Sequence, residues 1–446
     1  MKAHIHKYWD RLRSSFWFLP SIMTGCAIVL AFASVALDEA VTNQWLLSSA
    51  WVWAYAGSAE GASSVLGTIA GSMMTIAGVV FSMTLVALSL ASSQFGSRLL
   101  RNFMRDTANQ VVLGTFLSTF VYCLLIMRTI RRPEDTYFVP HLSVTIGVLF
   151  ALISLGVLIY FIHHVAISIQ ADEIVARVGA ELIDEIDRLF PQKIGQEATP
   201  LLDLSIAFSN ESGTVAAAAD GYLQFIDGDA LMALAEQEDV LLRLERRPGQ
   251  YVVCGSPLVM AWPGDKVTEK FVEEVNSAFI LGNQRTSAQD VEFAVHQLVE
   301  IAVRALSPGI NDPFTAMACV DRLGSALCRV AQRDLPSPHR FDEQGQLRIV
   351  APASTFAGIV DAAFNQIRQY ARSSAAVTIR LLETITVIAA ATRQPQDQAA
   401  LRRHAEMIMR SARDGLPEEE DRRTVEDRYQ AANRALIKAF NESPAH

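Results

Sequence analysis

The chain has 446 residues, a formal net charge of −9 and a hydrophobic content of 51%. Its charge is divided unevenly. Residues 1–165 carry 10 basic and 7 acidic side chains, whereas residues 166–446 carry 28 basic and 40 acidic side chains. An apolar, slightly basic part is therefore followed by an acidic part. This balance argues against nucleic acid as a partner, because phosphate contacts need clustered Lys and Arg.

Cysteine and histidine spacing gives no sign of a metal or a cofactor. The five cysteines contain no CxxC pair, so we expect buried free thiols in a reducing compartment rather than a disulfide framework. His163 and His164 would point about 100° apart on a helix, and no third ligand is evident nearby. We interpret them as interfacial anchors or as pH sensors.

Four apolar runs predict transmembrane helices, because about 20 apolar residues cross a hydrocarbon core of roughly 30 Å. The expected spans are residues 14–37, 62–91, 107–127 and 138–162, within a transmembrane domain of residues 1–171. Four spans place both termini on one side of the bilayer.

Basic residues indicate that this side is cytoplasmic. Lys and Arg occur before the first span and in the second loop, whereas the first loop has none. The third loop disagrees, because Arg128, Arg131 and Arg132 would then lie outside. We give the earlier segments more weight, since orientation is usually set early.

The second span carries a stripe of small, weakly polar residues at helical spacing, in a run without charged side chains between Glu60 and Arg98. The stripe consists of Gly67, Gly71, Thr75, Gly78, Ser82, Ser89 and Ser93. One interpretation is close helix–helix packing, as in small-xxx-small motifs. The other is a pore lining, where hydroxyls and backbone carbonyls replace part of an ion's hydration. The two are compatible in an oligomer that surrounds an axis.

Charged groups near the spans are open to more than one interpretation. No Asp, Glu, Lys or Arg lies inside the four expected spans, which disfavours ion-coupled active transport. Arg98, Arg101 and Arg105 share one helical face after the second span. They either meet anionic lipid headgroups or surround the inner mouth of a pore.

The acidic part is expected to be an α+β domain in the cytosol. We divide it into a linker helix (172–198), a small β module (199–265) and a helical domain (266–446). Within the β module, the segment from Arg247 to Leu258 resembles the hairpin of barrel-sandwich modules. It lacks the Lys that would carry biotin or lipoate, so we interpret the module as a spacer or assembly surface.

The segment Ala305–Ala316, ALSPGINDPFTA, is the strongest candidate site in the soluble part. Asp312 is expected to cap a helix that begins at Pro313. One interpretation is a structural corner between helices. The other is a ligand or subunit contact formed by Arg285, Arg304, Asn311 and Asp312.

Two blocks of sequence, Phe81–Leu100 and Arg285–Ala316, together resemble a bacterial family of predicted inner-membrane proteins, domain-of-unknown-function family 2254. The similarity in order and layout extends over nearly the whole chain. It implies a membrane domain followed by a cytosolic domain in a bacterial cell, and it implies no activity or substrate.

We therefore expect a homo-oligomeric, multi-pass protein of the bacterial inner membrane. The sequence contains no P-loop, G-x-S-x-G, H-E-x-x-H or dinucleotide-binding motif, so we do not expect an enzyme. The preferred function is passive passage of a small ion or solute along the second span, with the cytosolic domain in assembly or gating. The alternative is a membrane-anchored scaffold or sensor whose cytosolic domain binds a partner or ligand.

Overall fold

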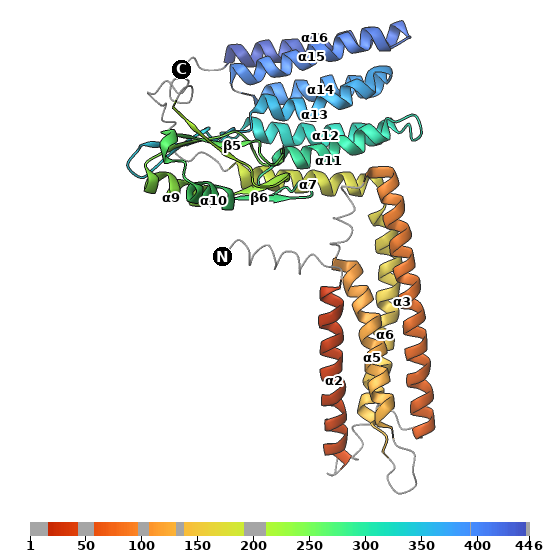
Figure 1. Cartoon of the computed structure of the whole chain (residues 1–446). Helices are drawn as coiled ribbons and strands as arrows, with labels where there is room; N and C mark the ends of the chain where they lie inside the picture. The colour runs from red at the N-terminus through yellow and green to blue at the C-terminus, as the bar shows by residue number, and fades with distance from the viewer. Residues whose placement is uncertain are drawn as a thin grey trace. The chain divides into compact units, whose positions relative to one another are not determined.

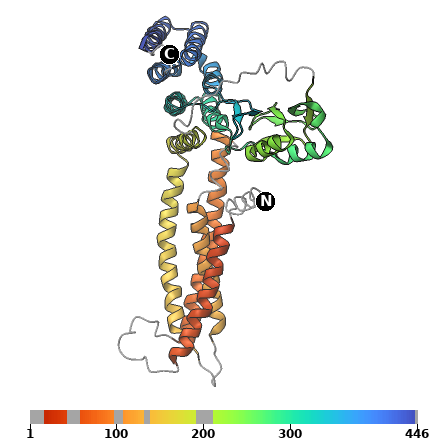
Figure 2. The same ribbon diagram turned by 90° about the vertical axis from the view of Figure 1, so that its left-hand side faces the viewer.

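The computed structural model describes residues 17–42, 58–96, 107–130, 138–190, 211–392 and 394–442. The chain divides into two compact units, residues 1–173 and residues 174–446. Figures 1 and 2 show both units from two sides. Arg98, Arg101 and Arg105 lie outside the described residues.

The first unit is a bundle of four long apolar helices, as the sequence predicts. They are α2 (Phe18–Thr42), α3 (Ala59–Phe95), α5 (Thr107–Thr129) and α6 (His141–Ser168). All four are long and apolar enough to cross a bilayer. Helices α5 and α6 each pack against all three of the other helices, and α5 makes the most extensive contacts. Its side chains Phe116, Tyr122 and Ile126 are completely buried.

Helix α3 is one continuous helix of 37 residues. It begins where the Ser58 hydroxyl accepts a hydrogen bond from the N–H of Gly61, and it ends at Gly96, whose φ of 111° a side chain would disfavour. At a rise of 1.5 Å per residue its length is about 55 Å. The expected second span, residues 62–91, therefore lies inside a longer helix.

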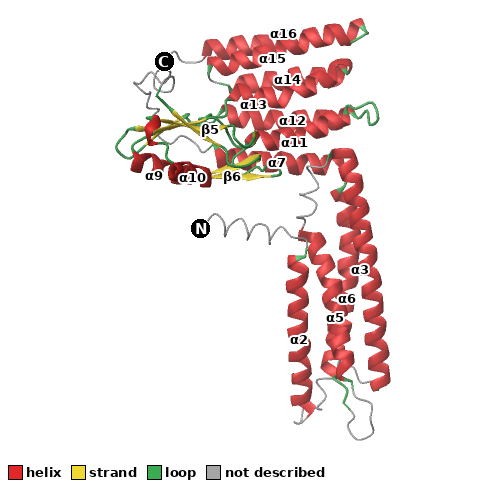
Figure 3. Cartoon of the chain, viewed as in Figure 1, coloured by secondary structure: helices red, strands yellow, loops and turns green. Residues whose placement is uncertain are grey.

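The second unit combines two small sheets with a stack of helices, which Figure 3 distinguishes by colour. Its larger sheet has the strand order β1-β5-β3-β8-β7, and its smaller sheet has the order β4-β2-β6. The strands are β1 (Gly213–Ala216), β2 (Gly221–Ile226), β3 (Leu241–Leu244), β4 (Tyr251–Val252), β5 (Pro257–Trp262), β6 (Phe279–Gly282), β7 (His339–Phe341) and β8 (Leu347–Val350).

The described strands form no barrel, so the expected likeness to a barrel-sandwich module is wrong. The two halves of the expected hairpin belong to different sheets: β4 pairs with β2, whereas β5 pairs with β1 and β3. Strands β7 and β8 come from within the expected helical region and join the larger sheet through a parallel pairing of β8 with β3. Pairing partners distant in sequence thus decide the architecture.

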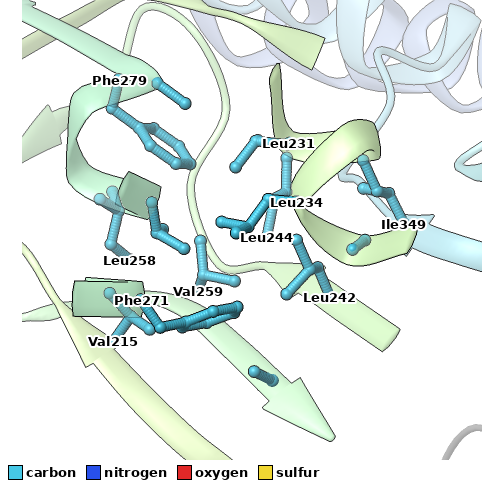
Figure 4. Packing of buried hydrophobic residues seen from close by; sticks show 14 of the residues in the cluster. Val215, Leu231, Leu234, Leu242, Leu244, Leu258, Val259, Phe271, Phe279 and Ile349 are labelled. Atoms are coloured by element: carbon cyan, nitrogen blue, oxygen red, sulfur yellow. The ribbon is translucent and has the colours of Figure 1, made fainter. Parts of the chain in front are cut away.

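Two helices close the core between the sheets, α9 (Gly228–Glu238) and α10 (Glu269–Ser277). Figure 4 shows Leu231 and Leu234 of α9 and Phe271 of α10 packing with strand residues such as Leu242 and Val259. Each fully buried side chain of this size contributes about 1.5–3 kcal/mol.

The remaining helices form two parallel layers. In one layer α11 (Val291–Ala305), α13 (Phe356–Tyr370) and α15 (Pro395–Gly415) lie side by side. In the other, α12 (Pro313–Ala331), α14 (Ala375–Ala391) and α16 (Glu419–Glu442) do the same. Each consecutive pair is one helical hairpin, and three hairpins stack so that each buries the apolar face of the next.

Helix α7 (Ala171–Leu189) packs into the second unit through Val178, Leu182 and Ile186, which are all buried. Its Asp187 forms ion pairs with Arg329 of α12 and with Arg333, two residues after the end of that helix, whose guanidinium lies 2.6 Å from the carboxylate. These contacts make α7 part of the helical stack. The rest of the expected linker, residues 191–198, lies outside the described residues.

Candidate functional sites

The small-residue stripe of α3 faces away from the chain's own bundle. Gly67 is partly buried, and the other six members are exposed: Gly71, Thr75, Gly78, Ser82, Ser89 and Ser93. The opposite face supplies the packing, with Leu66, Ala70, Met73, Ala77 and Val80 buried against neighbouring helices. Packing within one copy of the chain therefore does not explain the stripe.

The glycines of the stripe have empty space beside them. A Cβ atom built on Gly71 or Gly78 would meet no atom of the chain within 4 Å, and one on Gly67 would meet only the sulfur of Met127 at 3.8 Å. The contrast is Gly147 of α6, where a Cβ would lie 2.9 Å from Leu66. Gly147 is thus needed for packing inside the bundle, whereas Gly71 and Gly78 are not.

The hydroxyls of the stripe differ in their hydrogen bonds. Thr75 donates to the carbonyl of Gly71 at 3.0 Å, and Ser93 donates to that of Leu90 at 2.9 Å. Ser82 and Ser89 donate to no described residue. An exposed hydroxyl without a partner is unfavourable in hydrocarbon, so this face suits either a second protein surface or water.

A buried polar network ties the bundle together, and the sequence did not reveal it. We expected the first span to end at Leu37, but α2 continues to Thr42 and buries Asp38. The carboxylate of Asp38 accepts hydrogen bonds from the N–H groups of Leu142 and Ser143 and from the hydroxyl of Ser143. The hydroxyl of Tyr122 lies 3.1 Å from that of Ser34 and donates to the carbonyl of Ser143. This network joins α2, α5 and α6.

The 305–316 segment is a tight corner between α11 and α12. Asp312 accepts from the N–H groups of Phe314 and Thr315 and from the hydroxyl of Thr315, which confirms the predicted N-cap. Asn311 has a φ of +51°, a conformation that Asn tolerates better than most residues. Ile310 and Phe314 are exposed at 43% and 77%. The corner thus presents two apolar side chains.

Arg285 and Arg304 do not join this corner. The guanidinium of Arg285 lies 2.7 Å from the carboxylate of Asp290 and 3.1 Å from the imidazole of His296. Arg304 forms an ion pair with Glu300, one turn earlier on the same helix. The four residues that we expected to form one contact are therefore divided between three places.

A groove that the sequence did not predict lies beside β3 and α9, with a volume of about 370 Å³. Its apolar lining comes from Ile226, Leu231, Met232, Leu244, Ile349 and Ala351, and its basic lining from Arg246, Arg247 and Arg340. We call it the Arg246–Arg340 groove. From the sequence, Arg246 and Arg247 indicated only a turn, because Arg340 is almost a hundred residues away.

Among the described residues, no group of three or more His, Cys, Asp or Glu is arranged to hold a metal ion. The four apolar helices and the mixed α/β unit that follows them in sequence define a multi-pass membrane protein with a second folded unit. The model of the family described as "Predicted membrane protein (DUF2254)" matches residues 13–387, and the chain belongs to this family.

Proteins similar in sequence to this chain occur in mycobacteria. The chain is 32% identical over 425 residues to the uncharacterized protein Rv1290c of Mycobacterium tuberculosis and, equally, to the uncharacterized protein Mb1321c of Mycobacterium bovis. The alignment covers 93% of this chain and 80% of each relative. No solved structure matches the chain significantly.

Proposed function

We propose that the protein is a homo-oligomer of the bacterial inner membrane in which the exposed stripe of α3 borders a passive path for a small ion or solute. The observation that supports this is the orientation of the stripe: its glycines and hydroxyls face away from the other helices of the same chain. In this proposal both termini are cytoplasmic, the soluble unit assists assembly or gating, and no catalysis is involved.

The open space beside Gly71 and Gly78 makes the test specific. A Cβ atom at either position meets no described atom of the same chain within 4 Å, so we expect each protomer with leucine there to fold normally. Any effect of Gly71→Leu or Gly78→Leu must then come from a second copy or from the path. The matched control is Gly25→Leu on α2, where a Cβ also meets nothing within 4 Å.

The experiment is ion flux in liposomes with K⁺, Na⁺ and Cl⁻ gradients, beside cross-linking of the reconstituted protein. We expect selective flux in the wild type and the Gly25→Leu control, and its loss in Gly78→Leu with the oligomer intact. If Gly78→Leu instead abolishes the oligomer, the stripe is a packing surface between protomers. Absence of flux from a verified wild-type oligomer would reject the channel.

The exposed apolar pair on the 305–316 corner favours a second candidate, a scaffold whose soluble unit binds a protein partner. Phe314 is 77% exposed beside Ile310, although apolar side chains of this size are usually buried. In that case the wild-type protein conducts no ions, and Phe314→Ser removes capture of the partner.

A further inference from the structure

The Arg246–Arg340 groove combines an apolar lining with basic side chains, and all its walls lie in the second unit. Pro248, Gln289 and Pro352 complete the rim, and a second hollow of about 240 Å³ continues from it past Asp290. Small-molecule sites in proteins have this composition: mostly apolar walls, a few convergent polar groups and a volume of a few hundred Å³.

Two neighbouring arginines in the groove, Arg246 and Arg247, differ in their hydrogen-bond partners. Arg247 forms a bidentate pair with Glu292, at 2.7 and 3.1 Å, so its charge is neutralised. Arg246 forms no hydrogen bond or ion pair with the described residues, and its Nε atom is buried without an acceptor. A buried donor without a partner costs about 1–3 kcal/mol, so a native structure seldom keeps one without a reason.

Arg340 supplies a second guanidinium without an acidic partner. One of its terminal nitrogens donates to the backbone carbonyls of Ser337 and His339. Within the described part of the chain no carboxylate pairs with it. These contacts hold one terminal nitrogen of the guanidinium and leave its other N–H groups for another acceptor.

The acidic groups around the groove do not neutralise these arginines. Asp290 is bound by Arg285, and Glu292 is bound by Arg247. Asp229, in the first turn of α9, is exposed at the rim. Among the described residues, neither guanidinium has an acidic partner, and both lie beside the apolar lining of the groove.

We infer that this groove binds a small organic anion, whose phosphate or carboxylate group pairs with Arg246 and Arg340 while its apolar body lies over Leu231, Met232 and Leu244. Guanidinium groups suit both oxyanions because their N–H donors match two oxygens at once. The ligand comes either from solution or from the headgroup of an anionic lipid, and the two sources share this chemistry. This binding does not depend on whether the protein conducts ions.

The test is calorimetric titration of the full-length protein in phosphatidylcholine nanodiscs. The probes are phenyl phosphate, inorganic phosphate, benzyl alcohol and dihexanoyl phosphatidic acid below its micelle concentration. We expect phenyl phosphate to bind at least tenfold more tightly than inorganic phosphate, and benzyl alcohol not to bind. Tighter binding of the short-chain phosphatidic acid than of phenyl phosphate indicates a lipid source, and the reverse order indicates a soluble ligand.

Two kinds of variant assign the binding to the groove. Arg246→Gln and Arg340→Gln should each weaken phenyl phosphate binding at least tenfold. The control is Arg402→Gln: Arg402 is an exposed residue of α15, so this variant loses the same charge and should bind phenyl phosphate like the wild type. Gly228→Leu keeps both arginines and adds a bulky side chain at a residue that lines the groove, where a Cβ meets nothing within 4 Å. Gly309→Leu, equally unhindered, is its control.

The inference is overturned if neither organic anion binds the wild type, or if binding survives both the arginine variants and Gly228→Leu. It is also overturned if Arg402→Gln weakens binding as much as Arg246→Gln does. Should an arginine variant misfold, the result of Gly228→Leu decides.

Discussion

The hydroxyl of Ser143 lies 2.6 Å from the carboxylate of Asp38, although the two residues are 105 positions apart. Helix α6 begins after Pro140, whose side chain forms no cap. Its first N–H groups would be unsatisfied, and the carboxylate from α2 accepts two of them. An acidic residue near the end of one apolar helix thus caps the start of another.

Replacing Asp38 with alanine should destabilise the bundle by about 2 kcal/mol or more, because it leaves buried N–H groups without an acceptor. Thermal unfolding in detergent, followed by circular dichroism, measures this effect. The control is Glu39→Ala, since Glu39 is the exposed next residue. Equal melting temperatures for the two variants would contradict a capping role for Asp38.

Gly147→Leu should also destabilise the bundle, by about 2 kcal/mol or more, because the new side chain overlaps Leu66. Gly156 lies on the same helix, and a Cβ atom there meets nothing within 4 Å, so Gly156→Leu should melt like the wild type. Thermal unfolding in detergent, followed by circular dichroism, compares the melting temperatures of the two variants. If both variants are equally stable, α3 and α6 do not pack as described.

Glu185 of α7 should make the stability of the second unit depend on pH. Burial raises the pKa of its carboxyl to about 7, although a hydrogen bond with Ser287 and the charge of Arg188 act in the opposite direction. One carboxyl oxygen is buried without a partner. Because the folded-state pKa exceeds the unfolded value of 4.5, the folded state binds more protons, and stability falls as the pH rises from 4.5 to about 7.

Glu185→Gln should therefore raise the free energy of unfolding at pH 8, by on the order of 2 kcal/mol, and leave it unchanged near pH 4.5. Chemical denaturation at both pH values provides the measurement. Asp184→Asn, which changes an exposed carboxyl on the same helix, should show no such difference. A gain of equal size at both pH values would disprove the ionisation argument.

Asn311 should tolerate glycine but not a β-branched residue. Its φ of +51° costs Asn and Gly little, whereas Val in this conformation is strained by about 1–3 kcal/mol. We expect Asn311→Gly to match the wild type in denaturation and Asn311→Val to unfold earlier. Similar denaturation midpoints for the two variants would show that the backbone at residue 311 changes conformation to accommodate valine.

Local patterns predicted the elements that depend on neighbouring residues. The apolar runs gave the four long helices, and the Asn-Asp-Pro sequence gave the cap at Asp312, because both effects act within a few residues. Long-range pairing was not predictable. The parallel partner of β3 is β8, about a hundred residues later, and Arg246 and Arg340 line one groove across a similar separation in sequence.

The candidate site was predictable only in part for the same reason. Helical periodicity identified the stripe of α3 but could not tell which face the rest of the bundle covers. Arg285 was assigned to the 305–316 corner, yet its carboxylate partner is Asp290, five residues away. Asp38 was missed because apolar content alone placed the end of α2 at Leu37, whereas its hydrogen bonds to α6 favour a longer helix.

The unbroken length of α3 has a mechanical consequence. To remain within a hydrocarbon layer of about 30 Å, a helix of about 55 Å would need a tilt near 57°, beyond the roughly 40° that membrane helices reach. Some of its turns must therefore project into the interfacial or aqueous region. Since the helix has no break, it acts as a stiff lever, and a rotation of about 10° about its midpoint would move each end by about 5 Å.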